Sequence, residues 1–190
     1  MRKRRKGRIL AFQALYAWDT KLSLSSQHSL SSQHSLNPTD DKEQALKELL
    51  DFSWAGKESI EDSTEDSSDD FPRLLVMGTV ENIKAVDDMI CRHLEHWDFS
   101  RLNSVDRALL RLSVYELLFK TAPPTVVIDE AVDISREYGT EDSYRFINGV
   151  LDGVKKTMQA ESGMCIQDES TKKKEKNNAP LRSASARRHK

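Results

Sequence analysis

The chain has 190 residues, of which 32% are charged and 7% aromatic, and its formal net charge is −2. No apolar run approaches the roughly 20 residues that cross a bilayer, so we expect neither a membrane span nor a signal peptide. Cys91 and Cys165 form neither a disulfide framework nor a zinc motif, which favours a reducing, cytoplasmic setting. High charge and few aromatic residues predict a folded core together with segments that do not fold.

Residues 1–8 are almost all basic and run directly into a predicted helix at 9–18. This basic run contains Arg4, Arg5 and Arg8. A basic terminus is often only a solvated tail, and that interpretation stays open. Its attachment to a rigid helix favours the alternative, a cluster of cations that follows a nucleic-acid backbone.

Two low-complexity segments interrupt the predicted helices. Residues 21–38 repeat the hexamer SLSSQH and predict a flexible linker, whose duplicated histidines lack the further ligands of a metal site. A short amphipathic helix is predicted near 45–54. Residues 56–70 then predict an acidic, serine-rich loop that is too polar to pack. Its neighbouring carboxylates lack the fixed geometry that acid–base catalysis requires.

Residues 71–97 predict one long helix, with Pro72 in its first turn and an apolar stripe that ends at Trp97. Near its end, His93 and His96 lack the spaced partners of a metal site. We therefore expect both histidines at the surface or at its boundary.

Asn103 and Ser104 are predicted to cap a helix that is apolar on most of its circumference and therefore central. Asp106, Arg107 and Arg111 occupy its narrow polar strip. The two arginines lie one turn apart and repel each other unless an anion or a carboxylate lies between them. Pairing with a neighbouring acid and contact with an RNA phosphate or base both remain open.

The stretch 123–158 predicts two helices joined by a turn, with Gly139 as a left-handed stop and Thr140 as the next N-cap. Four residues near the start of the second helix lie off its apolar stripe: Asp142, Arg145, Phe146 and Asn148. The simpler interpretation is a half-buried phenylalanine among solvated polar residues. The alternative is a platform for an unstacked base, because single-stranded RNA is held by stacking and by hydrogen bonds to base edges. Residues 159–190 predict a disordered basic tail.

Three blocks of the chain resemble the NusB transcription-antitermination family. They are GRILAFQALYAWD at 7–19, VDRALLRLSVYELL at 105–118, and the stretch 123–154 with its EDSYRFINGVLD. The basic residues before the first block also match the arginine-rich start typical of the family. The resemblance implies an all-α fold, with one compact domain at 1–158 built from two packed helical sub-bundles at 1–100 and 101–158.

The resemblance also implies a function. Family members bind the boxA segment of nascent ribosomal-RNA transcripts as a heterodimer with NusE, a protein of the small ribosomal subunit. The complex joins RNA polymerase and other Nus factors and suppresses premature termination. Seven positions match the RNA side of the family: Arg4, Arg5, Arg8, Tyr16, Arg111, Asp142 and Phe146. Asp106 and Arg107 match the region near the NusE contact.

We expect no catalytic residue, cofactor or metal, and a homodimer of the free protein stays open. Two other classes also remain. NusB-like domains occur fused to RNA cytosine methyltransferases, but those enzymes need a Rossmann-type domain, and no Gly-rich turn is present in the sequence. The second class is a protein–protein adaptor that binds no RNA. A further hypothesis is that the acidic residues 57–70 cover the basic run.

Overall fold

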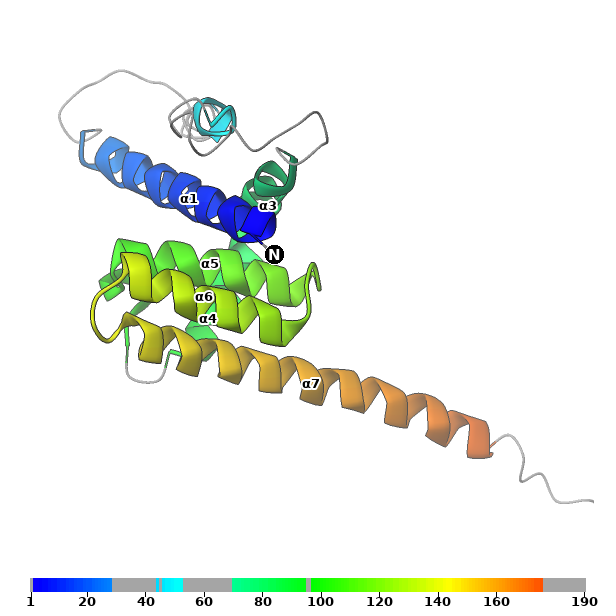
Figure 1. Ribbon diagram of the computed structural model, residues 1–190. Coiled ribbons are helices and arrows are strands. Elements are labelled where there is room, and N and C mark those ends of the chain that lie inside the picture. Colours follow the sequence, from blue (N-terminus) through cyan, green and yellow to red (C-terminus); the bar gives the residue numbers. More distant parts are fainter. Residues whose placement is uncertain (1, 29–43, 45, 53–69, 95–96, 176–190) are drawn as a thin grey trace, which may run out of the picture. The chain divides into compact units, whose positions relative to one another are not determined.

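The computed structural model describes all residues except 1, 29–43, 45, 53–69, 95–96 and 176–190. Every regular element of this described part is helical, which confirms the all-α class (Figure 1). The helices are α1 (Arg2–His28), α3 (Asp70–Glu81), α4 (Ile83–Arg92), the 3-10 helix η2 (Phe99–Arg101), α5 (Ser104–Leu118), α6 (Pro124–Tyr138) and α7 (Ser143–Glu175). Residues 44 and 46–49 are also helical. None of the described helices is long and apolar enough to cross a bilayer.

The chain divides into two compact units, Met1–Lys155 and Lys156–Lys190. α5 is the central helix of the first unit. It packs against α1, α3, α4 and α6, and Figure 1 shows α1 crossing over it while α6 runs alongside. Leu109 and Leu110 in its middle are both 0% exposed, which confirms the predicted central position. These contacts cross the boundary predicted at residue 100, because α5 packs against helices on both sides of it in the sequence.

The N-cap of α5 shows why the helix begins where it does. The side-chain oxygen of Asn103 accepts a hydrogen bond from the backbone N–H of Val105, at 3.0 Å. This bond satisfies one of the N–H groups that have no partner in the first turn of a helix. The predicted cap at Asn103 is therefore confirmed.

α3 approaches α5 closely at Gly78. A Cβ built on this glycine would lie 2.0 Å from the hydroxyl oxygen of Tyr115, so a larger residue would displace that ring. On α7, a Cβ on Gly153 would lie 2.9 Å from Nδ1 of His93, whereas a Cβ on Gly149 would meet open space.

Two segments predicted to be irregular, residues 21–28 and 159–175, are helical. The first belongs to α1, which begins with the basic residues and continues to His28. The linker predicted from residue 21 is therefore wrong as far as residue 28, and its remainder lies outside the described residues. The tail predicted to be disordered from residue 159 is helical to Glu175. Apolar periodicity reports the face that a helix buries, and a helix that is polar on all sides lacks this signal.

The single long helix predicted over 71–97 is wrong. It is broken between α3 and α4 at Asn82, whose side-chain amide donates a hydrogen bond to the carbonyl oxygen of Gly78 at 2.8 Å. Asparagine competes in this way for backbone groups and weakens a continuous helix. α4 ends at Arg92, and Trp97 is 60% exposed instead of lying in a buried stripe.

The turn between α6 and α7 also differs from its prediction. Gly139 ends α6, but with φ −90° and ψ −172° it has extended backbone and not the left-handed conformation. α7 begins only at Ser143, whose hydroxyl oxygen accepts a hydrogen bond from the backbone N–H of Thr140 at 2.9 Å. The residue directly before the helix is Asp142, so the predicted N-cap at Thr140 lies two residues too early. The predicted acidic loop at 56–70 lies outside the described residues except for Asp70.

Candidate nucleic-acid interface

Arg8, a predicted RNA contact, is buried between α1 and α5. Its Nε and Nη2 atoms donate hydrogen bonds to the two carboxylate oxygens of Glu116, at 2.8 and 2.9 Å. Arg8 is 4% exposed and Glu116 is 1% exposed. Two parallel charge-assisted hydrogen bonds fix the orientation of both groups. In this structure Arg8 therefore joins two helices.

The other arginines of the basic run lie nearer the surface. The guanidinium carbon of Arg4 lies 5.8 Å from the centre of the Phe71 ring, within the range of cation–π attraction, and that of the buried Arg8 lies 5.7 Å from the same ring. Arg5 is half-buried and donates a hydrogen bond to Asp133 of α6 at 2.9 Å. A helix end that carries exposed cations can bind the backbone of a nucleic acid. The exposed cations described here are Lys3, Arg4 and Lys6.

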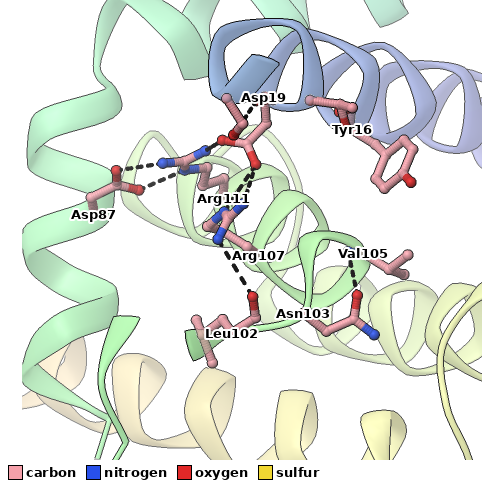
Figure 2. A network of polar contacts seen from close by, with 10 residues as sticks. Tyr16, Asp19, Asp87, Leu102, Asn103, Val105, Arg107 and Arg111 are labelled. Atoms are coloured by element: carbon pink, nitrogen blue, oxygen red, sulfur yellow. Dashed lines mark hydrogen bonds and ion pairs between the residues drawn. The ribbon is translucent and has the colours of Figure 1, made fainter. Parts of the chain in front are cut away.

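A network of ion pairs joins α1, α4 and α5 (Figure 2). Arg111 donates through Nε and Nη2 to the two oxygens of Asp87 and through Nη1 to Asp19, each at 2.8 Å. Arg107 donates to the other oxygen of Asp19. The carboxylate of Asp19 thus lies between the two arginines, so pairing with acids is the interpretation that the structure supports. Although burial opposes the charge of Arg111, the two carboxylates raise its pKa overall.

A cavity of about 340 Å³ is lined by residues from two stretches, 97–106 and 140–146. The rings of Trp97 and Phe146 lie 6.2 Å apart, centre to centre, with 55° between their planes. Trp97 is 60% exposed and Phe146 is half-buried, so aromatic surface is open to a ligand here. Six lining residues carry the chemistry of the cavity: Trp97, Arg101, Asp106, Asp142, Ser143 and Phe146.

Asp106 places a buried carboxylate in this cavity. The residue is 8% exposed, and its Oδ1 atom has no hydrogen-bond partner in the part of the chain that the structure describes. Burial raises the pKa of Asp106, while a hydrogen bond with Ser143 acts in the opposite direction. By contrast, the carboxylate of Asp142 is exposed and lies 3.4 Å from the guanidinium of Arg145. The surface that this cavity offers to a ligand is therefore aromatic, since the Oδ1 atom of Asp106 is itself buried.

The structure divides the predicted RNA-side residues between the two ends of α5. The arginines of the basic run lie near the last turn, where Arg8 contacts Glu116. The cavity with Asp142 and Phe146 lies at the first turn, which contains Asp106. Glu116 follows Asp106 by ten residues, or about 15 Å of helix.

The two remaining predicted RNA-side residues lie between these ends and differ in exposure. Tyr16, on α1 one turn before Asp19, is 40% exposed, whereas Arg111 is 8% exposed and held by its carboxylates. Within the described residues, no group of three or more histidines, cysteines or acids is arranged to hold a metal ion.

Sequence reasoning misses five residues of these sites: Asp19, Asp87, Trp97, Arg101 and Glu116. Glu116 carries a usable signal, because a carboxylate on a central, mostly apolar helix needs a buried cation. Trp97 is missed because its spacing fits the apolar stripe of the single long helix predicted over 71–97, which suggests a buried residue. Asp19 has no local signal, since its partner Arg111 is 92 residues away in the chain.

Comparisons with known proteins agree with this fold over most of the chain. The NusB family model matches residues 5–156. The chain is 44% identical to the transcription antitermination protein NusB of Treponema denticola over 153 residues, which cover 80% of this chain and 95% of that protein. The solution structure of NusB from Aquifex aeolicus is similar, with a TM-score of 0.60 at 30% identity, covering 85% of this chain and 93% of that one.

A further similar structure is a crystal structure of the antitermination factors NusB and NusE in complex with dsRNA. The TM-score is 0.56 at 28% identity, and the match covers 83% of this chain and 98% of that chain. The family model, the Treponema relative and both solved structures each match well over half of this chain. The chain therefore belongs to the NusB family, as its three sequence blocks predict.

Proposed function

We propose that this protein is a transcription antitermination factor that binds boxA RNA of nascent ribosomal-RNA transcripts together with NusE. Within that assembly it joins RNA polymerase and other Nus factors and helps the polymerase to read through terminators. One observation carries the proposal: the match covers 98% of the NusB chain that was solved with NusE and dsRNA. The Treponema relative, named as an antitermination protein, supports the same function.

The geometry supports two kinds of RNA contact. The exposed cations at the start of α1 suit phosphates, whose attraction is independent of sequence and weakens with salt. The open rings of Trp97 and Phe146 suit stacking of an unpaired base. Both contacts are non-covalent, and the proposed role requires no catalysis.

Arg8 and Arg111 take a positioning role in this proposal. Their N–H groups are bonded to Glu116, Asp87 and Asp19, so a phosphate would have to displace a carboxylate to reach them. Leaving a buried charge without its partner is strongly unfavourable. Contact with phosphate therefore falls to the exposed cations, and the NusE contact expected at Asp106 and Arg107 stays a prediction.

The proposal is tested by titrating a fluorescent boxA RNA with the purified full chain, with and without NusE, at several salt concentrations. We expect binding that strengthens with NusE and whose logarithm falls with the logarithm of salt, by about 0.7 for each phosphate neutralised. A scrambled RNA of equal length is the control. Binding of NusE with no affinity for either RNA would instead support the adaptor class.

A further inference from the structure

α3 carries large apolar side chains on its outer surface. Leu74 is 64% exposed and Met77 is 41% exposed, and residues three apart on a helix are neighbours. The surface continues onto the end of α5, because the hydroxyl of Tyr115 lies against Gly78 of α3. The rings of Tyr115 and Phe119 are 4.8 Å apart, centre to centre, and Phe119 is 49% exposed. Adjacent exposed apolar residues of this size are typical of a surface that another molecule covers.

Opposite charges flank this apolar surface at equal spacing. Arg73 lies four residues before Met77 and Glu81 lies four residues after it, and both side chains are exposed. Four residues correspond to about 6 Å along a helix and to nearly the same face. Asp70 and Lys84, also exposed, lie seven residues before and after Met77, the latter at the start of α4. The order along this face is therefore negative, positive, apolar, negative, positive.

We propose that this face binds a second copy of this chain, with the two α3 helices antiparallel and crossing at Met77. A two-fold axis at Met77 places each residue opposite the one that lies equally far beyond Met77 in the other copy. Arg73 then lies opposite the partner's Glu81, and Asp70 opposite the partner's Lys84. The inference goes beyond the proposed function, because the contact needs neither RNA nor NusE.

The charge pattern selects a second copy in preference to a different protein. A two-fold contact requires unlike charges at equal distances on either side of its centre, and this face has two such pairs. A parallel arrangement would place each charge opposite its own copy, which is repulsive. Exposed ion pairs contribute little energy each, so the affinity comes from burying Leu74, Met77 and Phe119. The charges then fix the antiparallel orientation.

The alternative role of Arg73 lies within one chain. Arg73 also lines an open groove with Glu48 and Asp51, and Glu48 already accepts a hydrogen bond from Lys21 at 2.7 Å. If Arg73 served this groove, reversal of its charge would lower the stability of the single chain. No second variant of the chain would compensate for that loss. Self-association and stability therefore distinguish the two roles.

The experiment measures self-association of the full chain, freed of nucleic acid, by sedimentation velocity over a series of concentrations. We expect a wild-type dimer whose population rises with concentration. Arg73→Glu and Glu81→Arg each create two pairs of like charges at the interface, so each variant alone should dimerise roughly tenfold more weakly. A mixture of the two variants restores both unlike pairs, and its mixed dimer should form about as tightly as the wild type.

Two further variants separate this face from the rest of the surface. Met77→Lys places two like charges at the two-fold axis and should abolish the dimer. Val126→Lys is the matched control, because Val126 is 38% exposed and lies on α6, and it should leave the dimer unchanged. Thermal unfolding followed by circular dichroism checks that all four variants are folded.

Four results would overturn the inference. A wild-type chain that stays monomeric at every concentration would exclude the contact. A dimer that survives Met77→Lys would lie on another face. A mixture of Arg73→Glu and Glu81→Arg that associates no better than its components would exclude the antiparallel pairing. A lowered melting temperature of Arg73→Glu, with no gain in that mixture, would assign Arg73 to its own chain.

Discussion

The ion pairs of Arg8 and Arg111 differ from the cavity at Asp106 in whether their charged groups have partners. In the ion pairs, the guanidinium groups of Arg8 and Arg111 each meet a carboxylate through two hydrogen bonds of 2.8–2.9 Å. In the cavity, one oxygen of Asp106 has no partner in the described part of the chain, and Trp97 beside it is 60% exposed. Charges that are already paired hold the helices together, whereas the exposed ring of Trp97 remains available to a ligand.

This difference matters because both arginines match RNA-side positions of the family. A cation is useful to RNA only if its N–H groups are accessible, and here they are occupied by acids from other helices. Removing one partner of a buried pair leaves the other charge uncompensated, whereas removing both is often nearly neutral. Single and double variants can therefore separate a structural pair from an RNA contact.

The largest effect is expected for Arg8→Ala. Loss of the guanidinium leaves the 1% exposed carboxylate of Glu116 without its cation, and we expect a loss of about 3–5 kcal/mol in the free energy of unfolding. Urea unfolding measures this loss directly. The double variant Arg8→Met with Glu116→Leu should recover most of the stability, since no charge is then left alone.

Arg4→Ala is the matched control, because Arg4 lies one turn earlier on α1 and is exposed. It should leave the free energy of unfolding almost unchanged. The slope of log affinity for RNA against log salt concentration should become shallower by about 0.7, the value for one phosphate contact. If Arg8→Ala instead kept its stability and lowered the salt slope, Arg8 would be the RNA contact and the comparison would fail.

The next effect concerns the cavity. Trp97→Ala removes the more exposed ring, and loss of one stacked base corresponds to roughly 5- to 150-fold weaker RNA binding. Stability should change little, because the residue is 60% exposed. Leu74→Ala is the control, since Leu74 is also a large apolar residue, is 64% exposed and lies on α3. Equal affinities of the two variants for boxA RNA would exclude stacking on Trp97.

The fold could be predicted wherever one local pattern decided the outcome. Asn103 is an N-cap because its side chain bonds within two residues, and α5 is central because it is apolar on most of its circumference. The break at Asn82 could not be predicted from the stripe, because apolar spacing continues across it. The helical stretch up to Glu175 escaped prediction for the opposite reason, since it has helix without an apolar stripe.

The candidate site could be predicted only in part. Residue type and resemblance pointed to Asp106 and Phe146, which the structure places in one cavity. They did not reveal that Arg111 is bound by Asp19 and Asp87, because those partners lie on two other helices. Pairing depends on tertiary contacts, and a sequence states only which charges exist. Whether a cation is available to RNA is therefore decided by the fold.

A smaller effect is expected for Arg111→Lys. Lysine keeps the charge but loses the two parallel bonds to Asp87, so we expect the free energy of unfolding to fall by about 1 kcal/mol. Arg136→Lys is the control, because Arg136 is exposed and its contact with Asp133 is longer, at 3.4 Å. Urea unfolding of both variants gives the difference. If Arg111→Lys lost more binding free energy for boxA RNA than free energy of unfolding, Arg111 would instead be an RNA contact.

The smallest effect is expected for Asp142→Asn, and it sharpens the comparison within the cavity itself. Asp142 and Asp106 both line the cavity, but the side chain of Asp142 is 84% exposed. An exposed carboxylate near the path of an RNA repels phosphate, and it also holds the guanidinium of Arg145 at 3.4 Å. Its removal should tighten RNA binding by roughly two- to fivefold at low salt, and less at high salt because the charges are screened.

Fluorescence titration of boxA RNA at two salt concentrations measures this effect. Unchanged or weaker affinity at low salt would mean that Asp142 itself accepts a hydrogen bond from the RNA. In that case the exposed carboxylate would be an RNA contact, and its attraction for an N–H donor would outweigh its repulsion of phosphate.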